Sequence, residues 1–121
     1  MAKILIVEDD ASIASLYKTE LELNKHVVKV LGTGVNAVKE ANDFGPDLIL
    51  LDIQLPDKGG VEILKDLRNN TATKSTKIAM LTNYATDTNI DASLEAGADD
   101  FIPKYKIVPE ELTQKVAELI S

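Results

Sequence analysis

The sequence alternates between two kinds of segment, and this alternation constrains the fold more than any other feature. Short runs of continuous apolar residues are typical of strands that are buried on both faces of a sheet. Such runs predict strands at residues 3–7, 27–31, 48–51, 77–81 and 100–103. Each parallel pair of strands needs a crossover connection, usually a helix. The segments between the runs are therefore expected to be helical.

The connecting segments carry apolar residues at helical spacing. The predicted buried stripes are Ile13, Leu16, Tyr17 and Leu21, then Val35, Val38 and Ala41, then Val61, Leu64 and Leu67, and finally Leu112, Val116, Leu119 and Ile120. Residues 87–96 have only Ile90 and Leu94 as large apolar residues, but their position between two strands predicts a helix. The pattern indicates a doubly wound α/β fold with a five-stranded parallel sheet and five helices.

Size and composition narrow the range of functions. A chain of 121 residues is long enough for one core, so we expect a single domain over residues 1–121 with no effector domain. The net charge of -7 and a single arginine, Arg68, argue against direct binding of nucleic acid. Without cysteine there is no disulfide framework or zinc thiolate site. No apolar run has the length of a signal peptide or membrane span, so we expect a cytoplasmic protein without a membrane partner.

Polar residues close four of the predicted strands. They are Glu8 and Asp9, Asp52, Thr82 and Lys104. In an open α/β sheet, ligands bind beyond the carboxyl ends of the strands, so these side chains are expected to converge at one edge. Taken singly, each has an ordinary explanation as a loop acid, a helix cap or a surface charge. Their common position favours a functional site.

The three carboxylates in this set need a cation or a proton between them. Like charges roughly 4 Å apart repel by about 4 kcal/mol at an effective dielectric constant of about 20. Mg²⁺ prefers oxygen ligands and is bound without a dedicated protein cage. A carboxylate beside Mg²⁺, a hydroxyl and an ammonium group is equipped to attack a phosphoryl group while the other groups offset its charge. The sequence thus predicts a site that forms an aspartyl phosphate.

Several motifs together resemble the receiver domain of two-component response regulators. They are residues 4–10 (ILIVEDD), residues 50–60 (LLDIQLPDKGG), Thr82 and residues 95–104 (EAGADDFIPK), and the resemblance covers the whole chain. It implies a CheY-like, flavodoxin-like sheet with strand order 2-1-3-4-5. It also implies Asp52 as the phosphoacceptor.

The resemblance assigns further roles within the site. Mg²⁺ would be held by Glu8, Asp9 and Asp52 together with the backbone carbonyl of Gln54. The hydroxyl of Thr82 and the ammonium of Lys104 would sense the phosphoryl group, and Phe101 matches the position of the family's aromatic switch residue.

The implied activity is that of a switch more than of an enzyme. The domain would take phosphate from a phosphohistidine on a sensor histidine kinase or a histidine phosphotransfer protein, in a reaction that it catalyses itself, and would lose it slowly. Thr82 and Phe101 flank residues 87–96, the segment with the thinnest apolar stripe. We therefore expect a downstream protein to bind the face formed by this fourth helix, the fifth strand and the last helix.

The chain departs from the family near the site. Tyr105 follows Lys104, where the family usually has a proline joined by a cis bond. Because a cis bond before a non-proline residue costs about 2.5 to 4 kcal/mol, we predict a trans bond and a repositioned, more mobile loop. The position after Thr82 holds Asn83, a bulkier polar residue than is common there. Tyr84, two residues after Thr82, is expected to border the phosphoryl group.

Two other functions fit the architecture less well. A small-molecule phosphatase or phosphotransferase with an aspartyl nucleophile usually has a second aspartate two residues later as general acid, and that position is Gln54. A flavin or nucleotide carrier would need a glycine-rich or hydroxyl-rich loop after the first strand, where residues 8–10 are acidic. His26 is expected to be an ordinary loop histidine far from the site.

Overall fold

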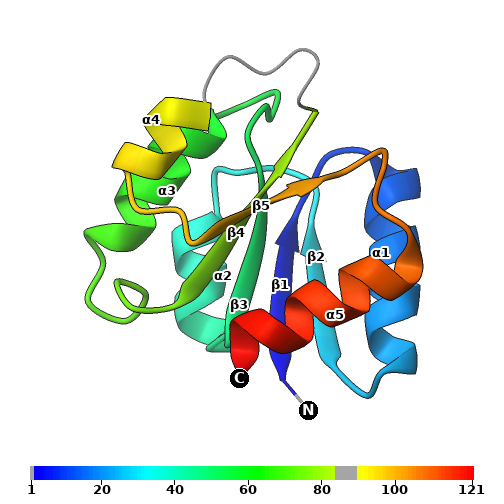
Figure 1. Ribbon diagram of the computed structural model, residues 1–121. Helices are drawn as coiled ribbons and strands as arrows, with labels where there is room; N and C mark the ends of the chain where they lie inside the picture. Colours follow the sequence, from blue (N-terminus) through cyan, green and yellow to red (C-terminus); the bar gives the residue numbers. More distant parts are fainter. Residues whose placement is uncertain (1, 84–89) are drawn as a thin grey trace.

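The structure, a computed structural model, describes residues 2–83 and 90–121. The elements are, in chain order, β1 (Lys3–Val7), α1 (Ala11–Leu23), β2 (Val27–Leu31), α2 (Ala37–Phe44), β3 (Leu48–Asp52), α3 (Gly60–Arg68), β4 (Lys77–Thr82), α4 (Ile90–Glu95), β5 (Asp100–Pro103) and α5 (Pro109–Ile120). The described strands form one parallel sheet in the order β2-β1-β3-β4-β5 (Figure 1). The expected fold class and strand order are confirmed.

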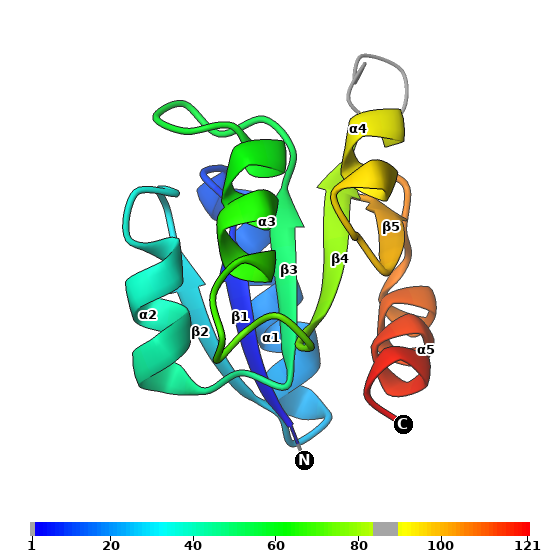
Figure 2. The same cartoon turned by 90° about the vertical axis from the view of Figure 1, so that its left-hand side faces the viewer.

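Helices cover both faces of the sheet, with α1 and α5 on one face and α2, α3 and α4 on the other (Figures 1 and 2). Successive strand residues point to opposite faces. Ile4 and Ile6 of β1 therefore pack under α1 and α5, whereas Leu5 and Val7 pack under α2 and α3. The strands are continuously apolar because both of their faces are buried.

Local signals set the ends of several helices. Asp10 is the N-cap of α1, where its carboxylate accepts hydrogen bonds from the amides of Ser12 at 3.0 Å and Ile13 at 3.2 Å. Pro109 begins α5, a position at which a missing amide hydrogen is not needed. Gly97 follows α4 with φ of 101°, a left-handed conformation that glycine adopts without steric penalty. Each of these interactions depends on residues close together in the chain, so the sequence alone can predict it.

Among the predicted stripe residues, Leu16 and Val35 are exposed, and Val61 is only partly buried and outside both core clusters. Leu16 is 57% exposed, because the buried face of α1 is centred on Ile13, Tyr17 and Leu21. A step of one residue turns about 100° around a helix, so Leu16 points away from that face. Val35 is 68% exposed and precedes α2. Its amide donates to Asp57 at 2.9 Å, which holds it in the preceding loop.

Two strands extend one residue beyond their predicted ends. The ladder continues through Asp52 in β3 and through Thr82 in β4. Both residues are thereby the last of their strands. The expected helix over 87–96 is present as α4 from Ile90, and its predicted start falls outside the described residues. No helix in the described part of the chain has both the length and the apolar character to cross a membrane.

Candidate functional site

The candidate site lies at the carboxyl edge of the sheet. Glu8 directly follows β1, Asp52 ends β3, Thr82 ends β4 and Lys104 directly follows β5. Glu8 and Asp52 are each 1% exposed, and Thr82 is fully buried. The parallel register aligns these strand ends, so residues that are far apart in the sequence meet at one place.

Lys104 connects the two buried carboxylates. Its Nζ lies 3.0 Å from Oε1 of Glu8 and 3.0 Å from Oδ2 of Asp52. Its backbone amide donates to the carbonyl of Thr82 at 3.0 Å, which joins the chain after β5 to the end of β4. The ammonium group therefore lies between Asp52, the predicted phosphoacceptor, and Glu8, a predicted metal ligand.

The acidic residues have the composition and spacing of a divalent cation site. Glu8, Asp9 and Asp52 each have a carboxylate oxygen within 4.8 Å of the others. The backbone orients two of these carboxylates: Oε2 of Glu8 accepts from the amide of Asp10 at 2.9 Å, and Oδ1 of Asp52 accepts from the amide of Gln54 at 3.1 Å. A set of hard oxygen donors fits Mg²⁺.

The pKa shifts of the buried groups show that the negative charges of this cluster are unfavourable in the metal-free site. Burial raises the pKa of Glu8 to about 7, and the neighbouring Asp52 adds to the effect. Burial also raises the pKa of Asp52, although hydrogen bonds from Glu8 and Lys104 oppose the change. Burial lowers the pKa of Lys104, but the ion pairs with Asp52 and Glu8 outweigh it, so the pKa of Lys104 is raised and the group stays charged. One ammonium group does not balance two buried carboxylates and Asp9.

A polar cavity of about 240 Å³ opens beside Asp52. Its lining includes Asp9, Gln54, Asn83, Lys104 and Tyr105. Asn83 and Tyr105, the two departures from the family pattern, thus both border the site. Tyr105 places its ring 5.4 Å from the Nζ of Lys104. Tyr84 lies outside the described residues.

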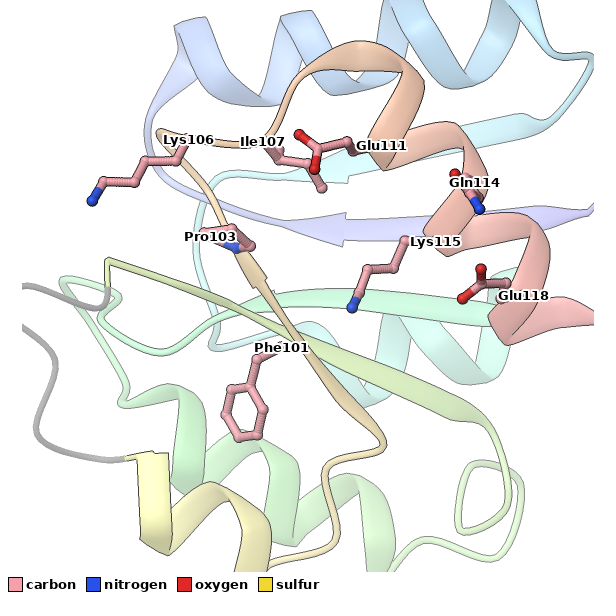
Figure 3. Close-up of a pocket in the computed structure, with 8 residues that line it drawn as sticks. All are labelled: Phe101, Pro103, Lys106, Ile107, Glu111, Gln114, Lys115 and Glu118. Carbon is pink, nitrogen blue, oxygen red and sulfur yellow. The ribbon is translucent and has the colours of Figure 1, made fainter.

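Phe101 lies away from this polar cavity. It is partly buried against the core cluster that includes Ile90 of α4. Figure 3 shows its ring turned toward α4 and away from α5. With Pro103, Ile107 and polar residues of α5 it lines a second cavity of about 400 Å³ (Figure 3).

The sequence analysis missed one contact of the site. The hydroxyl of Tyr17 in α1 donates to the backbone carbonyl of Lys104 at 3.0 Å. The helical stripe predicted only that Tyr17 is buried. The available signal was the hydroxyl itself, since a buried tyrosine needs a hydrogen-bond partner, but the sequence does not say which.

Two other expectations are confirmed. His26 lies between α1 and β2 and accepts a hydrogen bond from the amide of Ala2 at 3.1 Å, at the amino end of the strands and remote from the site. The described residues contain no cis peptide bond, so Lys104 and Tyr105 are joined by a trans bond.

Comparisons with known proteins agree with this architecture. Residues 4–117 match the family model of the response regulator receiver domain. The chain is 36% identical over 114 residues to the DNA-binding response regulator MtrA of Mycobacterium tuberculosis, covering 94% of this chain and 48% of that protein. It spans about half the length of the curated relatives it matches.

Solved structures give the same result. The chemotaxis response regulator CheY4 of Vibrio cholerae superposes with a TM-score of 0.90 at 28% identity, covering 98% of each chain. The receiver domain of the sensor histidine kinase PA1611 from Pseudomonas aeruginosa, with a magnesium ion in its active-site cleft, has a TM-score of 0.89 at 26% identity and covers 98% of this chain and 97% of that one. With the match over residues 4–117, these similarities establish that the chain belongs to the response regulator receiver domains, the signalling switches of two-component systems.

Proposed function

We propose that the protein accepts a phosphoryl group on Asp52 from a phosphohistidine of a sensor histidine kinase or histidine phosphotransfer protein. One observation carries the proposal: the carboxylate of Asp52, which lines a polar cavity, shares the Lys104 ammonium with Glu8. A nucleophile, a fixed positive charge and a carboxylate cluster therefore converge. In this proposal residues 1–121 act as one cytoplasmic receiver domain.

The chemistry follows from the groups present. An oxygen of Asp52 attacks phosphorus, the bond between phosphorus and the donor nitrogen breaks, and the imidazole leaves with the bonding electrons. Lys104, which stays charged, pairs with a phosphoryl oxygen. Thr82, the last residue of β4 at the same sheet edge, supplies a hydroxyl.

The residues that would hold Mg²⁺ are Glu8, Asp9 and Asp52 with the backbone carbonyl of Gln54. The three carboxylates fit the ion because their oxygens lie within 4.8 Å of one another. Bound there, Mg²⁺ would supply positive charge against the carboxylates and the phosphoryl oxygens. Relatives support this part of the proposal, since the PA1611 receiver domain carries a magnesium ion in its cleft.

We propose that the output passes through the face made by α4, β5 and α5. Thr82 pairs with Pro103 in the ladder, and its carbonyl accepts from the amide of Lys104, so a shift of Thr82 is transmitted to β5. Phe101, on β5, packs toward α4 and is the expected aromatic switch (Figure 3). A downstream protein would recognise the resulting change in this face.

The proposal assigns no direct nucleic-acid or membrane contact to these 121 residues, since their net charge is -7. The name of MtrA describes a DNA-binding protein, but the chain matches about half of it. Gln54, where a phosphatase of this type would have its general acid, disfavours the small-molecule enzyme. Glu8, Asp9 and Asp10 disfavour a nucleotide carrier, because they repel phosphates unless a metal ion intervenes.

Intact-mass measurement after incubation with acetyl phosphate and Mg²⁺ tests the proposal. We expect one added phosphate in the parent and none in Asp52→Asn, which keeps the shape of the side chain but removes the nucleophile. Excess chelator should prevent labelling of the parent. Equal labelling of parent and variant would contradict the assignment. A panel of phosphorylated histidine kinases then identifies the donor by its transfer rate.

A further inference from the structure

We infer that Tyr17 is a positioning residue for Lys104: its buried hydroxyl holds the Lys104 carbonyl and thereby directs the lysine side chain to Asp52. The inference rests on the proposed function and adds to it a residue from α1, an element that supplies no group to the reaction itself.

Two hydrogen bonds hold the backbone of Lys104. The carbonyl accepts from the Tyr17 hydroxyl at 3.0 Å, and the amide donates to the carbonyl of Thr82 at 3.0 Å. The first partner stands on α1 and the second on β4, so Lys104 is held from both sides of its Cα. The hydrogen bonds of the following turn run from the amides of Lys106 and Ile107 to Pro103 and do not involve this carbonyl.

The side chain that starts from this Cα carries the ammonium group of the site. The Nζ of Lys104 makes two contacts of 3.0 Å, to Glu8 and Asp52. A lysine side chain is long and has many rotamers, so placing its ammonium group reproducibly requires a fixed starting point. A proline after Lys104 would restrict the backbone there, but this chain has Tyr105. The Tyr17 hydroxyl supplies a restraint from another element.

The hydroxyl of Tyr17 is not needed for packing. The side chain is 2% exposed and lies in the core cluster shared by α1, α5 and the sheet. Phenylalanine would fill the same space without bringing a polar group into the core, where an unpaired hydroxyl is unfavourable. Burial, followed by the charge of Glu8, raises the pKa of Tyr17, so the hydroxyl remains a hydrogen-bond donor.

The test is Tyr17→Phe, which removes one oxygen. At saturating Mg²⁺ and subsaturating acetyl phosphate, we expect the phosphorylation rate constant to fall by about 5- to 10-fold, because a small displacement of a charge-stabilising group slows a reaction strongly. Binding of Mg²⁺ alone should change little, since the hydroxyl of Tyr17 bonds to the Lys104 carbonyl and not to a carboxylate of the cluster. A structural role alone would lower the melting temperature without this selective loss of rate.

Ile13→Val is the matched control. Ile13 is buried on the same face of α1, and the substitution removes one methylene group without changing a hydrogen-bonding side chain. We expect it to lower stability and to leave the phosphorylation rate constant within about twofold of the parent. If Ile13→Val slowed labelling as much as Tyr17→Phe, general loosening of α1 would explain both effects and the inference would be wrong.

A double-mutant cycle separates positioning from any other action of Tyr17. In a Lys104→Ala background, measured over longer incubation, adding Tyr17→Phe should cause no further slowing. Equal slowing in both backgrounds, or a Tyr17→Phe rate equal to that of the parent, would overturn the inference and leave the proposed function intact. A parent protein that is never labelled would instead overturn the proposed function.

Discussion

Two regions of the molecule meet at the site, and they differ in how firmly they are packed. On one side, β1 and β3 lie inside the sheet and α1 buries Ile13, Tyr17 and Leu21 against it. On the other side, β5 is an edge strand (Figure 2). Within the described part of α4 only Ser93 is buried, while Leu94 is 56% exposed. Regions with few buried contacts rearrange at a lower free-energy cost.

The difference in packing places the proposed phosphorylation chemistry and the proposed signalling surface in different regions. Glu8 and Asp52, the carboxylates that need a constant geometry, follow or end strands of the firmly packed region. Lys104 follows the edge strand β5 while its carbonyl is held by Tyr17 of α1, so the group proposed to pair with a phosphoryl oxygen connects the two regions. We therefore expect phosphorylation to change the structure of β5 and α4, the less firmly packed region, before that of α1.

Truncating one leucine in each region is the most direct way to break the comparison. Leu21 of α1 is fully buried, so Leu21→Ala should lower the free energy of unfolding by about 2 to 5 kcal/mol. Leu94→Ala in α4 should change it by less than about 0.5 kcal/mol, because that side chain is already exposed. Urea unfolding measures both values. Equal losses would show that α4 is anchored as firmly as α1.

Mg²⁺ should stabilise the folded chain, because it binds only the native cluster. At a free concentration 100 times the dissociation constant, the gain is about 2.7 kcal/mol. Asp9→Asn removes one of the three carboxylates, so it should raise the metal-free stability and weaken the response to Mg²⁺. Thermal melts with and without the ion measure both effects. A parent melting temperature indifferent to Mg²⁺ would argue against the metal site.

The metal-free protein should lose stability as the pH rises across the titration of Glu8. Its pKa is raised by burial from 4.5 to about 7, so the folded state binds a proton that the unfolded state releases. The resulting stabilisation is complete below pH 4.5 and is lost as the pH rises through about 7. Unfolding midpoints in chelator should therefore fall over this range, and less steeply in Glu8→Gln.

Glu22→Gln provides the control for this titration, because Glu22 is an exposed acid on α1 outside the cluster. It should leave the pH dependence of the parent unchanged. Saturating Mg²⁺ should flatten the dependence, since the cation favours ionised Glu8. A Glu8→Gln profile as steep as that of the parent would assign the proton to another group.

The smallest expected effect is a redistribution of structure within the folded state. Beryllofluoride, a mimic of the phosphoryl group, should shift the amide resonances of α4 and β5 more than those of α1. We expect this because the alternative conformations of the loosely packed region differ little in free energy. Nuclear magnetic resonance spectra of the parent with and without the mimic give the comparison, and Asp52→Asn is the control. Changes confined to α1 would refute the proposed route.

Much of the site could be predicted because it depends on strand ends. The continuous apolar runs locate the strands, and the residue that closes each run lies at the carboxyl edge, which is how Asp52 and Lys104 were found. The runs end one residue too early at Asp52 and Thr82, since hydropathy does not report the last bond of a ladder. Leu16 was misplaced because periodicity alone does not show which angular sector of α1 meets the sheet.

By itself, the sequence determined the alternation of strands and helices, and through it the edge at which the polar residues lie, because these features depend on the order of residues along the chain. Tertiary structure alone decided that one ammonium group lies 3.0 Å from both Glu8 and Asp52, that burial raises the pKa of Glu8 to about 7, and that the hydroxyl of Tyr17 reaches the carbonyl of Lys104. Hydrogen bonds and pKa shifts vary over fractions of an ångström, and those distances between remote residues are set only when the helices pack against the sheet.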